Sequence, residues 1–140
     1  MASILKVDSL TGVTTAGSIS VTGEGNSTTT NLQQGLCKAS INFTQVSTQT
    51  IRNSVNISSL SDSGTGQTSG ISFTSPMADS LFVGSFYANA NALTARNNFS
   101  NDYAGGFGDK VTSSFGTYSY GAAGPVDSAI NDVNIHGDLA

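Results

Sequence analysis

The chain has 140 residues, which suits one domain with room for an appendage. Only 10% of its residues are charged, against about 25% in a typical soluble domain, and the neutral polar residues Ser, Thr and Asn supply the polarity instead. The net charge is −4 and the five basic residues are scattered, which argues against nucleic-acid binding through phosphate contacts. No apolar run approaches the ~18 residues of a membrane span, and the first residues do not resemble a signal peptide, so we expect neither a membrane segment nor Sec export.

The N-terminal stretch SILKVDSLTGVTTAGSISVTGEG predicts two short strands joined by a Gly/Thr turn. Its seven aliphatic side chains would stabilise it by about 1.5–3 kcal/mol each if buried. Ordering about 20 residues costs roughly 1–2 kcal/mol each, and a lone hairpin is marginal. The polar segment 26–35 reads as a linker, so we expect residues 1–35 to act as an assembly arm that other chains order. The residues expected to dock and oligomerise are Ile4, Leu5, Val7, Leu10, Ile19 and Val21.

The body, residues 36–140, shows short apolar alternations separated by turn signals, and no sustained 3.6-residue period. The run at 81–87 is the most apolar and is predicted to be the central strand. SDSGTG at 61–66 is predicted to be a turn. These features predict an all-β fold, a compact antiparallel β-sandwich of the jelly-roll-like or immunoglobulin-like kind. The predicted strands are 38–43, 55–60, 67–74, 81–87, 111–120 and 130–139.

The segment 89–110 is rich in Asn and Gly and predicts one or two short strands with long surface loops. Such loops on a rigid scaffold often carry binding function, although many are only variable connections. Tyr118 and Tyr120 are two residues apart and would share one face of a strand, as a platform for a sugar or as half-buried sheet packing, which is commoner. The possible ligand or receptor residues are Asp102, Tyr103, Tyr118 and Tyr120.

No pattern in the sequence predicts catalysis, a metal site or a cofactor. Cys37 is the only cysteine, so we expect a small, partly buried hydrophobe, and the only histidine that could activate it is His136, far along the chain. The acidic residues form no close pair with a basic or histidine partner, and SDSGTG has one carboxylate where a calcium loop has several. We therefore expect a protein that is not an enzyme.

The N-terminal residues also carry a family resemblance. ILKVDSLTGVTTAGSISVTGEGNSTTTNLQQGL resembles the N-terminal segment of virion structural proteins of tailed phages, notably those of cyanobacteria, with the pattern LKVD-x-L-x-G-x-T-TAGSI. More loosely, KASINF, TIRNSVNISSLSDSGTGQ, ISFTSPMAD and VNIHGDLA resemble the β-rich domain that often follows it. The chain departs from that pattern at Ser40, where an aromatic residue is common, and at 44–49, where a glycine-rich turn is common.

The resemblance implies a structural protein on the surface of the phage particle, head or tail, made in the host cytoplasm. The chain lacks the shaft repeats of a long tail fibre, so a cement-like decoration protein or a short head or tail fibre fits better. The implied partners are other copies in a homotrimer and other capsid or tail proteins, with neither nucleic acid nor membrane. The alternative is a receptor-recognition module of a tail fibre that binds a host surface glycan.

Overall fold

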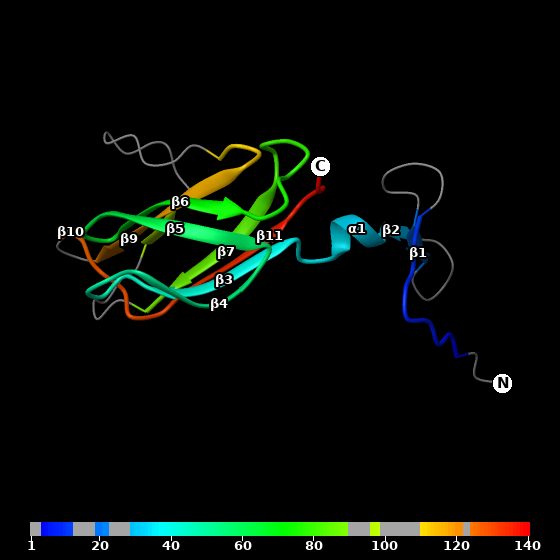
Figure 1. Cartoon of the computed structure of the whole chain (residues 1–140), viewed down its shortest axis with the longest axis horizontal. Coiled ribbons are helices and arrows are strands. Elements are labelled where there is room, and N and C mark those ends of the chain that lie inside the picture. The colour runs from blue at the N-terminus through cyan, green and yellow to red at the C-terminus, as the bar shows by residue number, and fades with distance from the viewer. Residues whose placement is uncertain (1–3, 13–18, 23–28, 90–95, 99–109, 122–123) are drawn as a thin grey trace. The chain divides into compact units, whose positions relative to one another are not determined.

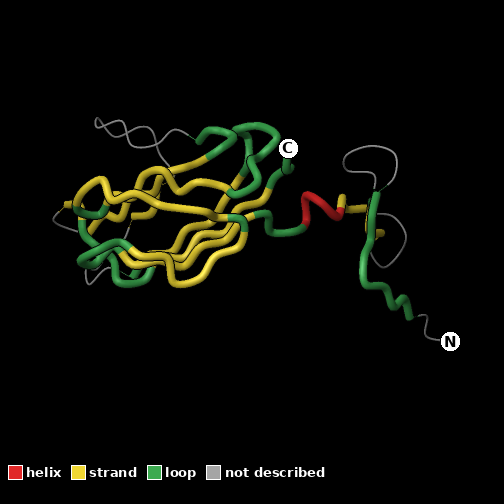
Figure 2. Tube along the Cα trace, viewed as in Figure 1, coloured by secondary structure: helices red, strands yellow, loops and turns green. Residues whose placement is uncertain are grey.

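The computed structural model describes residues 4–12, 19–22, 29–89, 96–98, 110–121 and 124–140. The chain divides into two compact units, Met1–Leu36, here called the arm, and Cys37–Ala140, here called the body. Strands make up most of the described body (Figure 2), and the all-β fold class is confirmed.

The arm holds a small hairpin. Strand β1 (Ser20–Thr22) pairs antiparallel with β2 (Thr29–Asn31) through three residue pairs, and the four-residue helix α1 (Leu32–Gly35) follows. The Leu32 amide closes the hairpin by donating to the Ile19 carbonyl at 2.8 Å. The prediction of two strands within residues 1–25 is therefore wrong in position, since residues 4–12 form no strand and β1 pairs with part of the expected linker. The threonines of β2 explain the difference, because β-branched residues favour strands even in a polar segment.

The body is an antiparallel β-sandwich, as predicted, and its two layers are visible in Figure 1. Sheet 1 has the order β4 (Thr50–Val55), β3 (Ala39–Thr44), β11 (Asn131–His136), β7 (Val83–Ala88). Sheet 2 has the order β10 (Gly124–Pro125), β9 (Ser114–Gly121), β6 (Gln67–Phe73), β5 (Ile57–Gly64), and β8 (Arg96–Asn98) also pairs with β9.

Burial alternates strictly on the two central strands of sheet 1. On β3, Ala39, Ile41 and Phe43 are buried, and on β11, Val133 and Ile135 are buried, while the residues between them are not. Successive side chains of a strand point to opposite faces, so the apolar set faces sheet 2 and the polar set faces outward.

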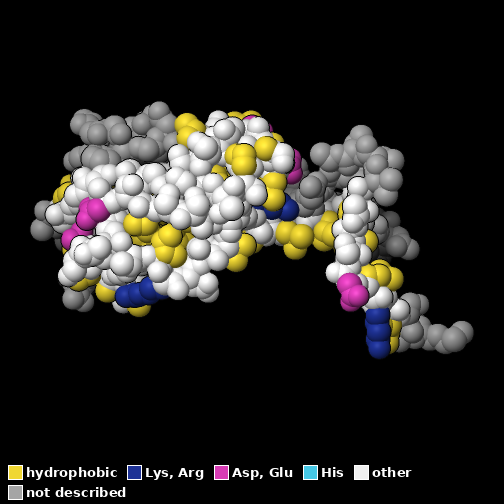
Figure 3. All heavy atoms as spheres, in the orientation of Figure 1, with side chains coloured by type: hydrophobic (Ala, Val, Ile, Leu, Met, Phe, Trp, Pro, Cys, Tyr) yellow, Lys and Arg dark blue, Asp and Glu magenta, His cyan; other side chains and the backbone are white. Residues whose placement is uncertain are grey.

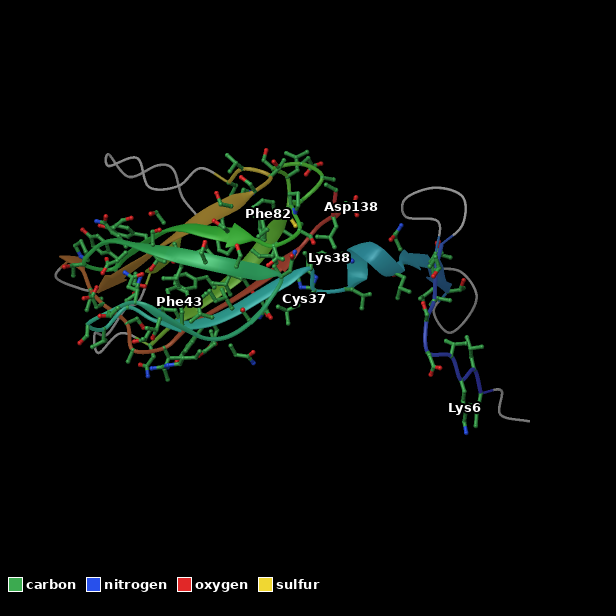
Figure 4. All side chains as sticks on the ribbon, viewed as in Figure 1. Lys6, Cys37, Lys38, Phe43, Phe82 and Asp138 are labelled. Carbon is green, nitrogen blue, oxygen red and sulfur yellow. The ribbon has the colours of Figure 1, made fainter. Side chains whose placement is uncertain are left out.

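The most apolar stretch of the sequence does not form the central strand. β7 begins only at Val83 and lies at the edge of sheet 1, and Leu81 and Val83 are 79% and 65% exposed. Phe82 is buried, but it precedes the strand (Figure 4). β11 lies at the centre instead. Its buried aliphatic residues alternate with less buried polar ones, which suits a sheet with one face on the core and one face in water.

The predicted strand 55–60 is broken at Asn56, which has a φ of 55°. That left-handed conformation ends β4 in sheet 1 and starts β5 in sheet 2. The Asn56 side chain stabilises the corner, since its Nδ2 donates to the Ser75 carbonyl at 3.0 Å and its Oδ1 accepts from the Ser75 amide at 2.7 Å. Asparagine tolerates this conformation better than most residues do. The predicted turn at 61–66 is also shorter, because β5 extends to Gly64 and β6 resumes at Gln67.

A bulge in β6 sets which of its residues face the core. Thr68 pairs with Thr117 and Ile71 pairs with Phe115, so β6 has one extra residue across this step. Gly70 supplies the bulge with a φ of 53°. As a result Thr68 and Ile71, three positions apart, both point inward and are fully buried.

One end of the sandwich core is apolar. Phe73, Phe82 and Phe115 stack there with ring centroids 5.4–6.4 Å apart, in the tilted and edge-to-face arrangements that aromatic rings prefer. Phe43 lies between the sheets further along (Figure 4). The full apolar cluster is Ala39, Ile41, Phe43, Ile57, Ile71, Phe73, Met77, Phe82, Phe115, Val133 and Ile135.

The other end of the same core is polar. Gln45 and Gln49, from the β3–β4 turn, both bond the Thr68 hydroxyl, at 3.1 and 2.7 Å. Asn131 accepts from Ser119 at 3.2 Å and donates to the Ser128 carbonyl at 3.1 Å. The Gln45 side chain and backbone both bond the backbone of Ser128, which joins the two groups. We call this set the polar cluster: Gln45, Gln49, Thr68, Ser119, Ser128 and Asn131, all of them buried.

Candidate functional site

The arm exposes the apolar side chains that the sequence marks for docking. Ile4 and Leu5 are each 78% exposed, and Val7, Leu10 and Val21 are each more than half exposed. Ile19 is half-buried, beside the hairpin bond to Leu32. A two-stranded hairpin with three residue pairs cannot bury these side chains by itself. The arm therefore presents an apolar surface, which we call the arm surface: Ile4, Leu5, Val7, Leu10 and Val21.

The tyrosines of β9 do lie together. Tyr118 and Tyr120 are half-buried and stack with ring centroids 5.5 Å apart and an interplanar angle of 27°. Their neighbours Thr117 and Ser119 point inward, so the tyrosine pair lies on the outer face of sheet 2. Asp102 and Tyr103, the other two expected ligand residues, lie outside the described residues.

The outer face of sheet 1 carries a hollow of about 410 Å³ over its two central strands, β3 and β11. Cross-strand pairing brings Asn42 beside Asp132 and Ser40 beside Asn134. The Asn42 Nδ2 donates to the Asp132 Oδ1 at 2.5 Å. We call this site the sheet-1 hollow, and its polar lining residues are Ser40, Asn42, Asn53, Asp132 and Asn134.

Sequence reasoning did not find the sheet-1 hollow. The segments 38–43 and 130–139 both show polar residues on the outward face of an alternating strand, which is the signal that was available. Nothing local in either segment says that they pair with each other, about 90 positions apart. Without that pairing, Asn42 and Asp132 read as solvated surface residues.

Cys37 is exposed, and the expectation of a partly buried cysteine is wrong. Its Sγ donates to the Ala39 carbonyl at 3.1 Å and lies 3.9 Å from the Asn134 Oδ1, at one end of the sheet-1 hollow. Cys37 is the first residue of the body and precedes β3, so it is outside the strand alternation that buries Ala39. His136 is half-buried at the end of β11, where it pairs with Val83.

Among the described residues, no group of three or more His, Cys, Asp or Glu side chains could hold a metal ion. The described helix is too short to cross a membrane. Figure 3 shows few charged side chains on the visible face, most of which is drawn as backbone or as side chains that are neither charged nor hydrophobic.

Comparisons of this chain with protein-family models, curated proteins and solved structures find no match.

Proposed function

We propose that this protein is a structural component of a tailed-phage virion that attaches to the particle through its arm. The observation that supports the proposal is the arm surface, where aliphatic side chains are left exposed in a unit whose described residues include no buried apolar side chain. Exposed apolar patches of this kind mark interaction sites in soluble proteins. The N-terminal resemblance to virion proteins supports the same reading.

The body has what a displayed domain needs. Its apolar cluster lies wholly within Cys37–Ala140, so the body contains a core independent of the arm. Few charged side chains lie on its visible face, as expected for a chain with 10% charged residues. We infer that the arm pairs with copies of itself in a homotrimer and docks on capsid or tail proteins, while the body faces outward as a decoration or short-fibre domain.

A truncation tests the attachment. Phage particles assembled without this protein would be incubated with the full chain or with residues 36–140, pelleted, and assayed for bound protein. We expect the full chain to pellet with the particles and the truncated chain to stay in solution. Normal incorporation of the truncated chain would overturn the proposal.

A matched pair of substitutions refines the test. Leu5 in the arm and Leu81 in the body are 78% and 79% exposed, so Leu→Gln removes the same apolar group from equally exposed positions. We expect Leu5→Gln to lower incorporation several-fold and Leu81→Gln to leave it near the wild-type level. Equal losses would show that general surface apolarity, and not the arm, drives attachment.

Light scattering coupled to size exclusion tests the oligomer. A trimeric full chain with a monomeric truncation would assign trimerisation to the arm, whereas trimers of both would assign it to the body. Monomers in both samples would contradict the proposed pairing of arms.

A further inference from the structure

We propose that the sheet-1 hollow binds a neutral, polyhydroxylated ligand, a carbohydrate, on the outer face of the body. The proposal concerns a face of the body, and it does not depend on how the protein attaches to a particle. At about 410 Å³ the hollow falls within the size range of small-molecule sites.

The lining supplies donors and acceptors without strong charge. Asp132 is the one acidic side chain among the lining residues, and a carboxylate accepts hydrogen bonds through both of its oxygens. The amides of Asn53 and Asn134 both donate and accept, and both side chains are exposed. Each hydroxyl of a sugar can both donate and accept a hydrogen bond. Adjacent hydroxyls can therefore donate to the carboxylate and exchange hydrogen bonds with the neighbouring amides.

The Asn42–Asp132 bond makes part of the site rigid before any ligand arrives. The Asn42 Nδ2 donates to the Asp132 Oδ1, and this bond fixes the orientation of the amide, which leaves its oxygen available to a ligand. The Asn42 Oδ1 and the second oxygen of Asp132 are not used in this bond, so both can accept hydrogen bonds from a ligand. A preorganised polar pair lowers the entropy lost on binding.

An exposed tyrosine lies beside the carboxylate, next to the residues that line the hollow. Tyr87 on β7 pairs with Asp132 on β11, so the two side chains are on the same face of sheet 1. Tyr87 is 57% exposed. A tyrosine ring offers an apolar surface to the C–H face of a sugar while its hydroxyl stays hydrated.

Other ligand classes fit the sheet-1 hollow less well. β3 and β11 each have neighbours on both sides, so their backbone groups are used within the sheet and an added peptide strand has no edge there. A second sheet packing on this face would require apolar side chains. The lining includes Ile41 and Val133, but both are buried toward the core, and the side chains that face outward are polar. The Asp132 carboxylate would repel a phosphate group, so the hollow is poorly suited to the backbone of a nucleic acid.

The test is a titration of the ¹⁵N-labelled full chain with the methyl glycosides of glucose, galactose, mannose, rhamnose and N-acetylglucosamine at millimolar concentrations. We expect at least one glycoside to shift the side-chain amide signals of Asn42, Asn53 and Asn134. A titration with dextran and dextran sulfate separates hydroxyl recognition from anion binding, and the sulfated polymer should bind no better.

Substitutions then locate the site. Asp132→Asn keeps the shape but removes the charged acceptor, so we expect affinity to fall about tenfold or more. Asp62→Asn makes the same charge change on sheet 2 and should leave affinity unchanged. Asn53→Ala, at an exposed position where folding is not at risk, should also weaken binding.

Three results would overturn the proposal. The first is no shift with any glycoside. The second is shifts that map to the Tyr118–Tyr120 stack, which would place a sugar site on sheet 2 instead. The third is equal affinity in the Asp132→Asn and Asp62→Asn proteins.

Discussion

The two ends of the body core are built from the same strands but from different chemistry. β6 starts at the polar end with Thr68 and finishes at the apolar end with Phe73, and β9 runs the other way, from Phe115 to Ser119. Burial of side chains at the apolar end stabilises the fold, and this stabilisation is non-directional. The polar end requires that each hydrogen bond be made, because an unmade buried bond costs about 1–3 kcal/mol. The difference indicates that the apolar end supplies stability and that the polar end holds the two sheets in one register.

The largest effect is expected at the apolar end. Phe115→Ala removes a ring that contacts both Phe73 and Phe82, and it leaves a cavity in a rigid core. We expect the free energy of unfolding to fall by about 3–5 kcal/mol, measured by urea denaturation. A loss below about 1 kcal/mol would contradict a packed aromatic end.

Asn131→Ala tests the polar end. Asn131 is fully buried and bonds Ser119, Ser128 and the Phe43 carbonyl, so its removal leaves buried groups without partners. We expect a loss of about 2–3 kcal/mol by urea denaturation. If the loss matched that of an exposed substitution, the polar cluster would not hold the sheets together.

Gly66→Ala tests how closely the chain packs at the edge of that polar end. Gly66 has a φ of 71°, and an added Cβ would meet the Ser119 carbonyl oxygen and lie 2.8 Å from the Val126 nitrogen. We expect a loss of about 1–3 kcal/mol in thermal unfolding, from backbone strain and crowding together. Gly124→Ala is the control, since Gly124 also has a positive φ, of 135°, but no atom within 4 Å of the added Cβ, and it should cost less.

The smallest effect has the opposite sign. Thr117 is 2% exposed, and its Oγ1 has no hydrogen-bond partner among the described residues. Thr117→Val keeps the branched shape and removes a buried hydroxyl, so we expect stability to rise by up to about 1 kcal/mol in urea denaturation. A clear destabilisation would show that the hydroxyl is satisfied in solution, for example by a buried water.

Local patterns predicted much of the fold. The alternation at 38–43 and 67–74 corresponds to β3 and β6, and the segment 130–139 contains β11. Alternation is a short-range property, since it depends only on which side chains can face one core. The apolar residues of the arm that the sequence marks for docking are exposed, apart from the half-buried Ile19.

Contacts between distant segments decided the rest. The strand within residues 81–87 lies at the edge of sheet 1 because β11 pairs between it and β3. The number of apolar residues in a segment does not predict whether its strand is central or at an edge. The positive φ of Asn56 takes the chain from sheet 1 to sheet 2, and the positive φ of Gly70 changes which residues of β6 face the core. Composition does not reveal either φ value. The polar cluster likewise needed Gln45, Thr68 and Ser128 to meet inside the core.

The sequence by itself therefore determined the fold class and the positions of several strands, and it predicts an arm too poor in apolar residues to be stable alone. Only the tertiary structure decided the strand order, the division of the core into an apolar and a polar end, and the sheet-1 hollow. The physical reason is the separation along the sequence of the residues that interact. Strand formation and side-chain alternation follow from neighbours one to a few positions away, whereas the juxtaposition of Asn42 with Asp132 exists only after antiparallel pairing closes a loop of about 90 residues.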